Sequence, residues 1–171
     1  MDKKVLIAFA TKHGATKEIA VRISQALNAT GVAADLRSAE DVVDLPAYDA
    51  FVIGSAVYAG QWRKEAAELL ESGEPAFLGK PVWLFSSGPT GEGDPAALMN
   101  GWTFPESLKP VAERIDPEDI AFFGGRLELD KLNLAEKILV KGIKAPIGDF
   151  RDWEAIDDWA AGIASSLQNG G

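Results

Sequence analysis

The sequence contains no cysteine and a single histidine, His13, in 171 residues. Without cysteine the chain cannot form a disulfide, supply a thiolate nucleophile or hold an iron–sulfur cluster through thiolates. One histidine also excludes a multi-histidine metal site. If the protein carries out redox chemistry, we therefore expect the electrons to reside on a bound organic cofactor and not on a metal.

Basic residues are outnumbered, and long apolar runs are missing. The chain has 17 Lys and Arg against 26 Asp and Glu, a net charge of −9 and a pI near 4.6. Because phosphate contacts need a basic surface, this balance argues against nucleic-acid binding. No stretch is long and apolar enough to span a bilayer, and the N-terminal apolar run is broken too early for a signal peptide. We expect a cytoplasmic protein.

The hydrophobic content, 47%, is enough for one core, so we expect a single domain over 1–171. Apolar runs predict strands at 5–10, 50–55, 81–87 and 120–124, with a short alternating strand at 32–38. Helical spacing predicts helices at 15–29, 62–72, 131–144 and 152–167. This alternation indicates a parallel sheet covered by helices on both faces. Ligands of such sheets bind beyond the carboxyl ends of the strands, which directs attention to the loops after Ala10, Ser55 and Ser87.

The first of these loops joins a predicted strand to a predicted helix and has the sequence Thr11-Lys12-His13-Gly14-Ala15-Thr16. Backbone N–H groups and the positive end of the helix dipole converge there, and hydroxyls, a cation and a glycine suit an anion. The loop lacks both GxxxxGK[ST] and GxGxxG, so a phosphomonoester fits better than a nucleoside triphosphate or a dinucleotide. Alternatively, Thr11 or Thr16 caps the helix, and Lys12 and His13 are solvated.

The second and third loops contain aromatic and small residues. "GSAVYAGQW", residues 54–62, places Tyr58, Gly60 and Trp62 just past a strand end, where a flat aromatic ligand could stack. "SSGPTGEG", residues 86–93, offers free amides for the opposite edge of such a ring. The alternative for Tyr58 and Trp62 is that they cover the sheet edge or pack under the next helix.

Together the three loops resemble those of the flavodoxin family, whose members hold FMN at the switch point of a five-stranded parallel sheet. The resemblance covers nearly the whole chain and implies a doubly wound α/β fold with strand order 2-1-3-4-5. It implies FMN as the cofactor, with a related deazaflavin left open. It places Thr11, Lys12, His13, Gly14, Ala15 and Thr16 around the phosphate, Ser55, Ala56, Val57, Tyr58 and Gly60 along the ring, and Ser87, Gly88, Pro89, Thr90 and Gly91 at its other side.

Two further segments point to a sub-family. "VIGSAVYAGQW" and the late "FFGGRLELDKLNLAEKILVKGIKAPIGDFRDWEAIDDWA" are similar to the menaquinone-dependent protoporphyrinogen dehydrogenases, flavodoxin-like proteins with a helix inserted late in the chain. This resemblance implies an inserted basic helical segment near 127–149. It also implies a small FMN-dependent oxidoreductase that passes electrons to a quinone, although no acid–base pair identifies a catalytic residue.

Two other functions stay open. The protein could be a soluble electron carrier of the flavodoxin type that docks on redox partner proteins. From another class, it could be a non-redox phosphate-ligand-binding or signalling domain of the same sheet order. That last function needs clustered acidic residues after the first strand, where the chain has Thr11-Lys12-His13.

The predicted helix at 131–144 differs in charge from the rest of the chain. Four lysines and one glutamate give it a net charge of +3, so the remainder of the chain carries −12. On a helical wheel Leu132, Ala135, Leu139, Val140 and Ile143 fall opposite Lys137, Lys141 and Lys144. The Lys131–Lys144 helix could therefore make weak peripheral contact with the inner face of the cell membrane. Alternatively, its apolar face packs on the domain and its lysines are solvated.

Overall fold

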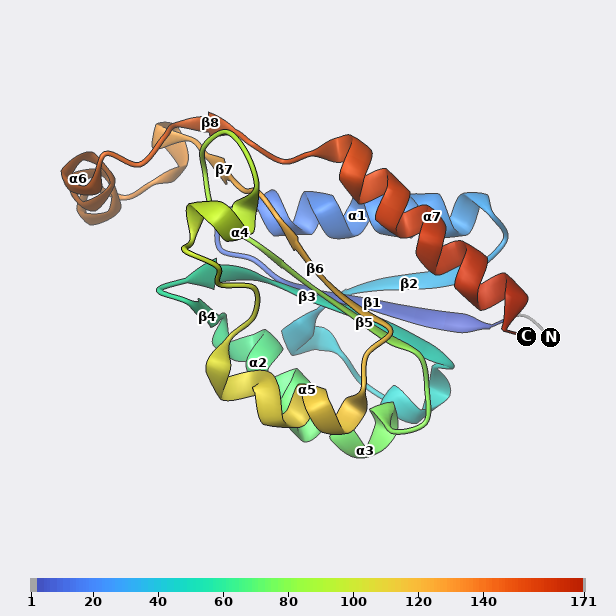
Figure 1. Ribbon diagram of the computed structural model, residues 1–171. Coiled ribbons are helices and arrows are strands. Elements are labelled where there is room, and N and C mark those ends of the chain that lie inside the picture. Colours follow the sequence, from blue (N-terminus) through green and yellow to red (C-terminus); the bar gives the residue numbers. More distant parts are fainter. Residues whose placement is uncertain (1–2, 171) are drawn as a thin grey trace.

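The computed structural model of the protein describes residues 3–170. A mainly parallel sheet in the order β2-β1-β3-β5-β6 forms its centre, which confirms the doubly wound α/β fold and the predicted strand order (Figure 1). The parallel strands are β1 Lys4–Ala10, β2 Ala33–Ser38, β3 Ala50–Tyr58, β5 Val82–Ser87 and β6 Asp119–Phe123. A two-residue strand, β4 Gln61–Trp62, pairs antiparallel with the end of β3.

The register brings the carboxyl ends of the three central strands together. Ala10 of β1 lies opposite Ser55 of β3, and Ala56 of β3 lies opposite Ser87 of β5. The loops that follow these strands therefore leave the sheet at the same edge, as the parallel arrangement predicts.

Helices cover both faces of the sheet. On one face lie α1 Ala15–Ala29 and α7 Trp153–Asn169, and on the other lie α2 Lys64–Ser72, α3 Glu74–Phe77 and α5 Lys109–Ile115 (Figure 1). The short α4, Pro95–Leu98, follows the loop after β5. Single turns of 3₁₀ helix occur at Ala39–Asp41, Leu45–Ala47, Glu106–Leu108 and Leu129–Lys131.

Successive residues of the buried strands point to opposite faces and divide the core into two halves. Ile7 packs with Ile19 and Ile156 beneath α1 and α7, whereas Leu6 packs on the other side with Leu70 and the remaining helices. Burial of each such side chain contributes roughly 1.5–3 kcal/mol. The two apolar faces of the sheet thus hold both helical layers in place, and the loops at its edge rest on a rigid base.

A two-stranded antiparallel ribbon with a helix is inserted between β6 and α7. Its two short strands, β7 Arg126–Leu127 and β8 Gly148–Asp149, pair antiparallel, and between them lies α6, Leu134–Ile143. We call residues 126–149 the insert. It projects past the edge of the sheet where the three site loops lie (Figure 1). Within residues 3–170 we find no helix with the length and apolar character needed to cross a membrane.

Two predicted helix boundaries differ from the structure for local reasons. α6 begins at Leu134 because Asn133 forms a capping box, accepting from the Glu136 N–H while its own N–H donates to the Glu136 carboxylate. It ends at Ile143 because Lys144 adopts a left-handed φ of 53°. α2 begins at Lys64, not at Trp62, because Trp62 belongs to β4.

Candidate functional site

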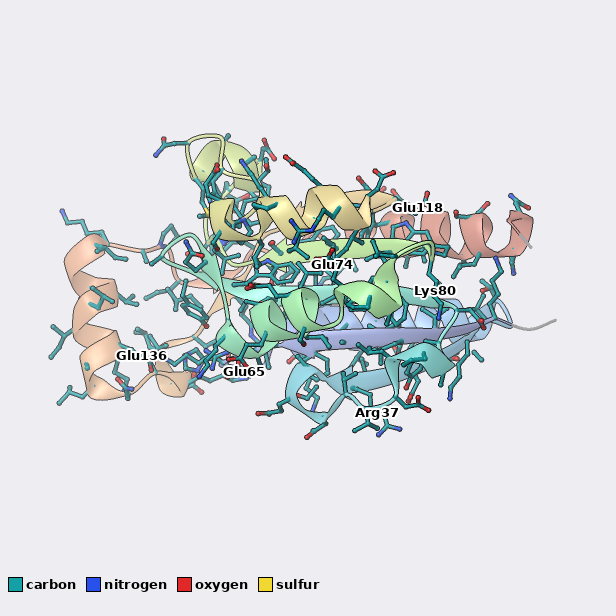
Figure 2. The ribbon with its side chains drawn as sticks, turned by 90° about the horizontal axis from the view of Figure 1, so that it is seen from below. Arg37, Glu65, Glu74, Lys80, Glu118 and Glu136 are labelled. Carbon is teal, nitrogen blue, oxygen red and sulfur yellow. The ribbon has the colours of Figure 1, made fainter. Side chains whose placement is uncertain are left out.

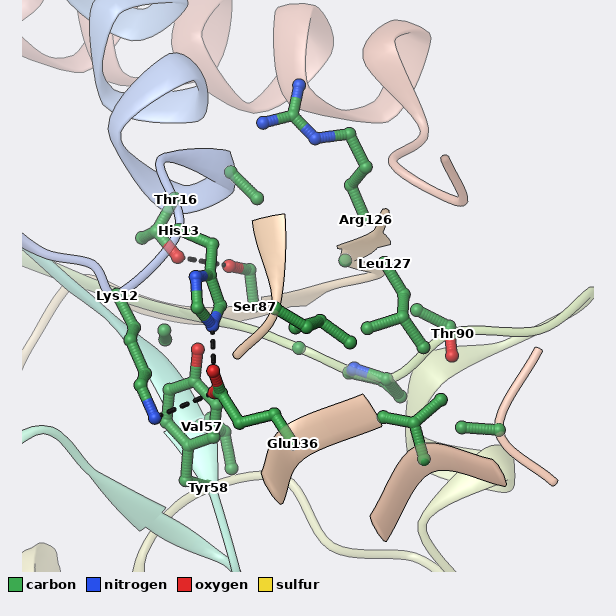
Figure 3. Close-up of a pocket in the computed structure, with 18 of the residues that line it drawn as sticks. Lys12, His13, Thr16, Val57, Tyr58, Ser87, Thr90, Arg126, Leu127 and Glu136 are labelled. Carbon is green, nitrogen blue, oxygen red and sulfur yellow. Dashed lines mark hydrogen bonds and ion pairs between the residues drawn. The ribbon is translucent and has the colours of Figure 1, made fainter. Parts of the chain in front are cut away.

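A cavity of about 480 Å³ lies at the carboxyl ends of β1, β3 and β5, where α6 forms one of its walls (Figure 3). All three predicted loops contribute to its lining, and so does the insert. Of the sixteen predicted site residues, the cavity is lined by Thr11, Lys12, His13, Ala15, Thr16, Ala56, Val57, Tyr58, Ser87, Gly88, Pro89 and Thr90.

The first loop turns tightly into α1. Gly14 has a φ of +91° and occupies the N-cap position, where no side chain caps the helix. The Gly14 N–H donates instead to Thr11 Oγ1 at 3.0 Å, which closes the loop. Capping by Thr11 or Thr16 is therefore wrong, and the N-terminal amides of α1 receive no acceptor from a side-chain cap, as a site for an anion requires.

Thr16 connects the first loop with the third. Its side chain is buried, and its Oγ1 lies 2.8 Å from Ser87 Oγ. Either hydroxyl can donate in this pair, so each keeps acceptor capacity toward the cavity. The bond fixes the start of α1 against the end of β5.

Lys12 and His13 both bind a carboxylate from the insert. Lys12 Nζ lies 2.8 Å and His13 Nε2 lies 3.0 Å from the same oxygen of Glu136 (Figure 3). The Lys12 contact, the backbone N–H of Asn133 and the His13 contact lower the pKa of Glu136 to about 2. The prediction that these two side chains are merely solvated is therefore wrong. In Figure 2, Glu136 lies on α6, apart from the acidic residues of the body such as Glu74 and Glu118.

The second loop presents Tyr58 at the mouth of the cavity. The residue is 44% exposed, and Lys12 Nζ lies 5.8 Å from the centroid of its ring. Desolvation raises the pKa of the Tyr58 hydroxyl, so the side chain stays neutral. An exposed aromatic face next to an apolar cavity wall offers a stacking surface for a flat ligand.

Four predicted residues lie outside the cavity lining. Ser55 is buried beneath it, where its Oγ donates to the Ala56 carbonyl at 2.8 Å and accepts from the Arg63 N–H at 2.9 Å. Gly60 faces the Trp102 side chain, and Gly91 faces Leu98 and Pro146. Gly14 shapes the loop through its backbone and does not line the cavity itself. Trp62 packs in the core and donates to Ser86 Oγ, which confirms the packing alternative for this residue.

The third loop packs closely against its neighbours through Gly88 and Gly125. A Cβ on Gly88 would lie 3.2 Å from the Val57 carbonyl oxygen, and a Cβ on Gly125 would lie 2.6 Å from the Gly88 carbonyl oxygen, which a side chain at position 125 would not tolerate without a backbone shift. The Gly125 N–H donates to the Pro89 carbonyl at 2.8 Å. The loop after β6 therefore supports the third loop from behind.

Sequence reasoning missed the contribution of the insert. Its lining residues are Arg126, Leu127, Leu132, Glu136, Leu139, Val140, Ile143 and Ala145. The helical spacing of Leu132, Leu139, Val140 and Ile143 was the only signal for this wall, and it was equally consistent with packing on the domain. No local motif marks Arg126 or Glu136.

Two arginines attach the insert to the body through Glu18 of α1. Arg126 Nη1 and Arg151 Nη1 each donate to the Glu18 carboxylate at 3.0 Å. Desolvation alone would raise the pKa of Glu18, but the hydrogen bond from Arg151 and the charge of Arg126 keep it below its ordinary value. Arg126 Nη2 is buried and has no hydrogen-bond partner among the described residues.

The site can hold a ligand that combines an anionic and an aromatic part. The first loop supplies amide and hydroxyl groups, which suit a phosphate, and a Lys12 side chain that is paired with Glu136. Val57, Tyr58 and Pro89 supply flat or apolar surface to the lining of the same cavity. The lone buried Nη2 of Arg126 is a further donor that such an anion would satisfy.

Comparisons with known proteins agree with this arrangement. A family model described as flavodoxin domain matches residues 6–153. A flavodoxin of Streptococcus pneumoniae TIGR4 is 17% identical, with a TM-score of 0.63 over 98% of this chain and 99% of that chain. A flavodoxin from the domain Archaea is 15% identical, with a TM-score of 0.62 over 96% and 99% of the two chains.

A larger protein contains a similar unit. The rubredoxin oxygen:oxidoreductase of Desulfovibrio gigas is 14% identical, with a TM-score of 0.59 over 97% of this chain and 36% of that chain. No curated protein sequence matches the chain. At these identities the structural likeness establishes the fold.

Proposed function

The chain belongs to the flavodoxin domain family, and we propose on this premise that it is an FMN-binding redox protein. The observation that carries the proposal is the meeting of the 11–16 loop with Tyr58 and Ser87 around one cavity. When bound, FMN supplies one- and two-electron transfer chemistry. The protein's part is to bind the cofactor, orient it and limit its contact with water.

The residues present fit FMN. The amides of the 11–16 loop and the hydroxyls of Thr11 and Thr16 would hold the phosphate. Val57 and Tyr58 would contact one side of the ring, and the stretch 87–90 the other. Ser55, Gly60 and Gly91, which the family resemblance also suggests, would act only from behind the lining.

The absorbance spectrum and the mass of whatever copurifies with the protein test this proposal. We expect a yellow protein with flavin absorbance and a released compound of the mass of FMN, and a deazaflavin would be identified by its own mass. If the protein is colourless, titration of FMN should quench flavin fluorescence at a defined stoichiometry. A folded apoprotein that takes up no FMN would overturn the proposal.

We further propose that the protein is an oxidoreductase of the protoporphyrinogen dehydrogenase (quinone) type. The support is the resemblance of the insert to those enzymes, together with the apolar side chains that α6 adds to the cavity wall. Leu139, Val140 and Ile143 extend the site beyond what a phosphate and a ring need. An apolar wall beside the flavin suits an acceptor with a hydrophobic body.

Turnover measurements separate this enzyme from an electron carrier. We expect the reduced holoprotein to reoxidise rapidly with a water-soluble menaquinone analogue, and protoporphyrinogen to support steady turnover. Absence of turnover with both, combined with saturable docking on a flavoprotein reductase, would favour the soluble carrier and contradict the enzyme.

We also propose weak peripheral contact of α6 with an anionic membrane surface. Leu134 is 74% and Ile138 is 65% exposed, so this part of the helix does not pack on the domain. Lysines flank the same helix, and this pairing of exposed apolar and basic side chains is typical of helices that lie on anionic lipid.

A further inference from the structure

We propose that Arg126 binds the phosphate of the cofactor and makes the site selective for phosphorylated flavin over riboflavin. The inference rests on the proposed FMN site and adds to it a ligand that comes from the insert and not from the three loops. Arg126 opens β7 and lines the cavity beside Ala15 and Thr16.

Two of the three guanidinium nitrogens of Arg126 already contact carboxylates, and the third has no partner among the described residues. Its Nη1 donates to Glu18 at 3.0 Å, and its Nε lies 3.3 Å from a carboxylate oxygen of Glu128. The side chain is 11% exposed, and Nη2 is buried without a partner. A buried donor without a partner costs free energy in the unliganded protein, and a ligand that accepts from it recovers that cost.

The unpaired nitrogen faces the phosphate loop. A Cβ built on Gly14 would lie 3.9 Å from Arg126 Nη2, so the nitrogen borders the backbone of the 11–16 loop. Figure 3 shows the side chain reaching from β7 toward the beginning of α1. Ala15, at the same place, has only a methyl group and offers no polar side chain, so the guanidinium is the polar group that the loop lacks there.

The Lys12 ammonium of the loop is already paired with a carboxylate. Lys12 and His13 share one carboxylate oxygen of Glu136, at 2.8 and 3.0 Å. A dianion that enters the loop therefore needs another charged donor. The planar guanidinium suits phosphate better than an ammonium because its N–H groups form a fixed fork. Glu18 accepts from both Arg126 and Arg151, which orients Arg126 and leaves its buried Nη2 without a partner among the described residues.

Dissociation constants for FMN and riboflavin, measured by quenching of flavin fluorescence, test the inference. The ratio of the riboflavin constant to the FMN constant reports what the phosphate adds. In Arg126→Gln we expect this ratio to fall roughly 10- to 100-fold, the effect of losing one hydrogen bond between charged groups. Riboflavin affinity should stay within about twofold. Arg126→Lys, which keeps the charge but not the fork, should show a smaller fall.

The matched control is Arg22→Gln. Arg22 also belongs to an arginine–carboxylate pair, with Asp157, but it does not line the cavity. The ratio of the riboflavin to the FMN dissociation constant in Arg22→Gln should equal that of the wild type. The ³¹P resonance of bound FMN should shift in Arg126→Lys and stay unchanged in Arg22→Gln, which provides a readout even if Arg126→Gln does not fold.

Each other outcome overturns the inference in a distinguishable way. An unchanged ratio and an unchanged ³¹P resonance in both Arg126 variants would show that the phosphate does not contact this residue. Equal losses for FMN and riboflavin would show that Arg126 only attaches the insert to α1. A folded wild-type protein that binds neither flavin would remove the proposed function itself.

Discussion

At the scale of single residues, Glu136 determines how the insert meets the phosphate loop. Its carboxylate accepts from Lys12 and His13 and from the backbone N–H of Asn133. One oxygen thus links the insert to the 11–16 loop, while the other anchors the start of α6. The charge of this residue should therefore influence both the stability of the insert and the access of an anion.

The pKa of Glu136 predicts a pH dependence of stability. Because the folded-state pKa, about 2, lies below the ordinary value of 4.5, the folded protein binds this proton less readily than the unfolded chain. The contribution of Glu136 is complete above the unfolded value and is lost as pH falls toward about 2. We expect the difference in Tm between wild type and Glu136→Gln, followed by circular dichroism, to shrink over this range. A Tm difference that does not change with pH would contradict the lowered pKa of Glu136.

The buried hydroxyl pair of Thr16 and Ser87 gives a second prediction. In Thr16→Val the Ser87 hydroxyl loses its 2.8 Å partner inside the protein. We expect the free energy of unfolding of the apoprotein to fall by about 1–3 kcal/mol, measured by urea denaturation. Thr16→Ser, which keeps the hydroxyl, is the control, and its free energy of unfolding should fall clearly less. Affinity for FMN should also drop in Thr16→Val if the hydroxyl accepts or donates at the phosphate.

The residues of the site could be predicted where chemistry is local in sequence. The 11–16 loop was recognisable because hydroxyls, a glycine and a helix start lie within six consecutive positions. Arg126 and Glu136 could not be predicted, because their partners are distant in the sequence. Arg126 lies 108 positions from its partner Glu18, and Glu136 lies 123 positions from its partner His13. Their approach depends on the path of the insert, which no local pattern specifies.

At the scale of elements, strands were the better-predicted class. Continuous apolar runs identified four of the five parallel strands, because side chains on both faces of a covered sheet are buried, and alternation identified the fifth, β2. α5, Lys109–Ile115, was missed, since it has only seven residues and a proline in its first turn. For α6 the sequence left open whether its apolar face is exposed or packs on the domain, because a helical wheel does not show whether a neighbouring element covers that face.

Two substitutions should shift the stability of α6 in opposite directions. Asn133→Ala removes the capping box and should destabilise the helix by about 1 kcal/mol. Gly142→Ala meets no atom within 4 Å and should stabilise it by about 1 kcal/mol. Hydrogen exchange of a peptide covering 134–143 should become faster in the first variant and slower in the second. Exchange that is identical in both would show that tertiary contacts, and not helix propensity, control α6.

At the scale of the whole molecule, charge is distributed unevenly. The total is −9, yet the stretch 131–144 carries +3. An anionic surface therefore attracts the molecule only in the orientation in which α6 faces it. At physiological salt the acidic remainder is screened beyond a Debye length of about 8 Å, so the projecting helix can act independently of it.

This asymmetry makes membrane contact testable with intact protein. Each lysine near an anionic surface contributes about 1 kcal/mol, so Lys137→Gln/Lys141→Gln should weaken binding to vesicles rich in anionic lipid roughly 10- to 30-fold in sedimentation assays. Lys64→Gln/Lys109→Gln changes the net charge equally on α2 and α5, on the body of the protein, and should leave binding unchanged. Leu134→Ser/Ile138→Ser should weaken binding without altering its salt dependence, because these exposed side chains contribute apolar area and no charge. Equal binding of wild type and the α6 variants, or equal binding to neutral and anionic vesicles, would rule out α6 as a membrane contact.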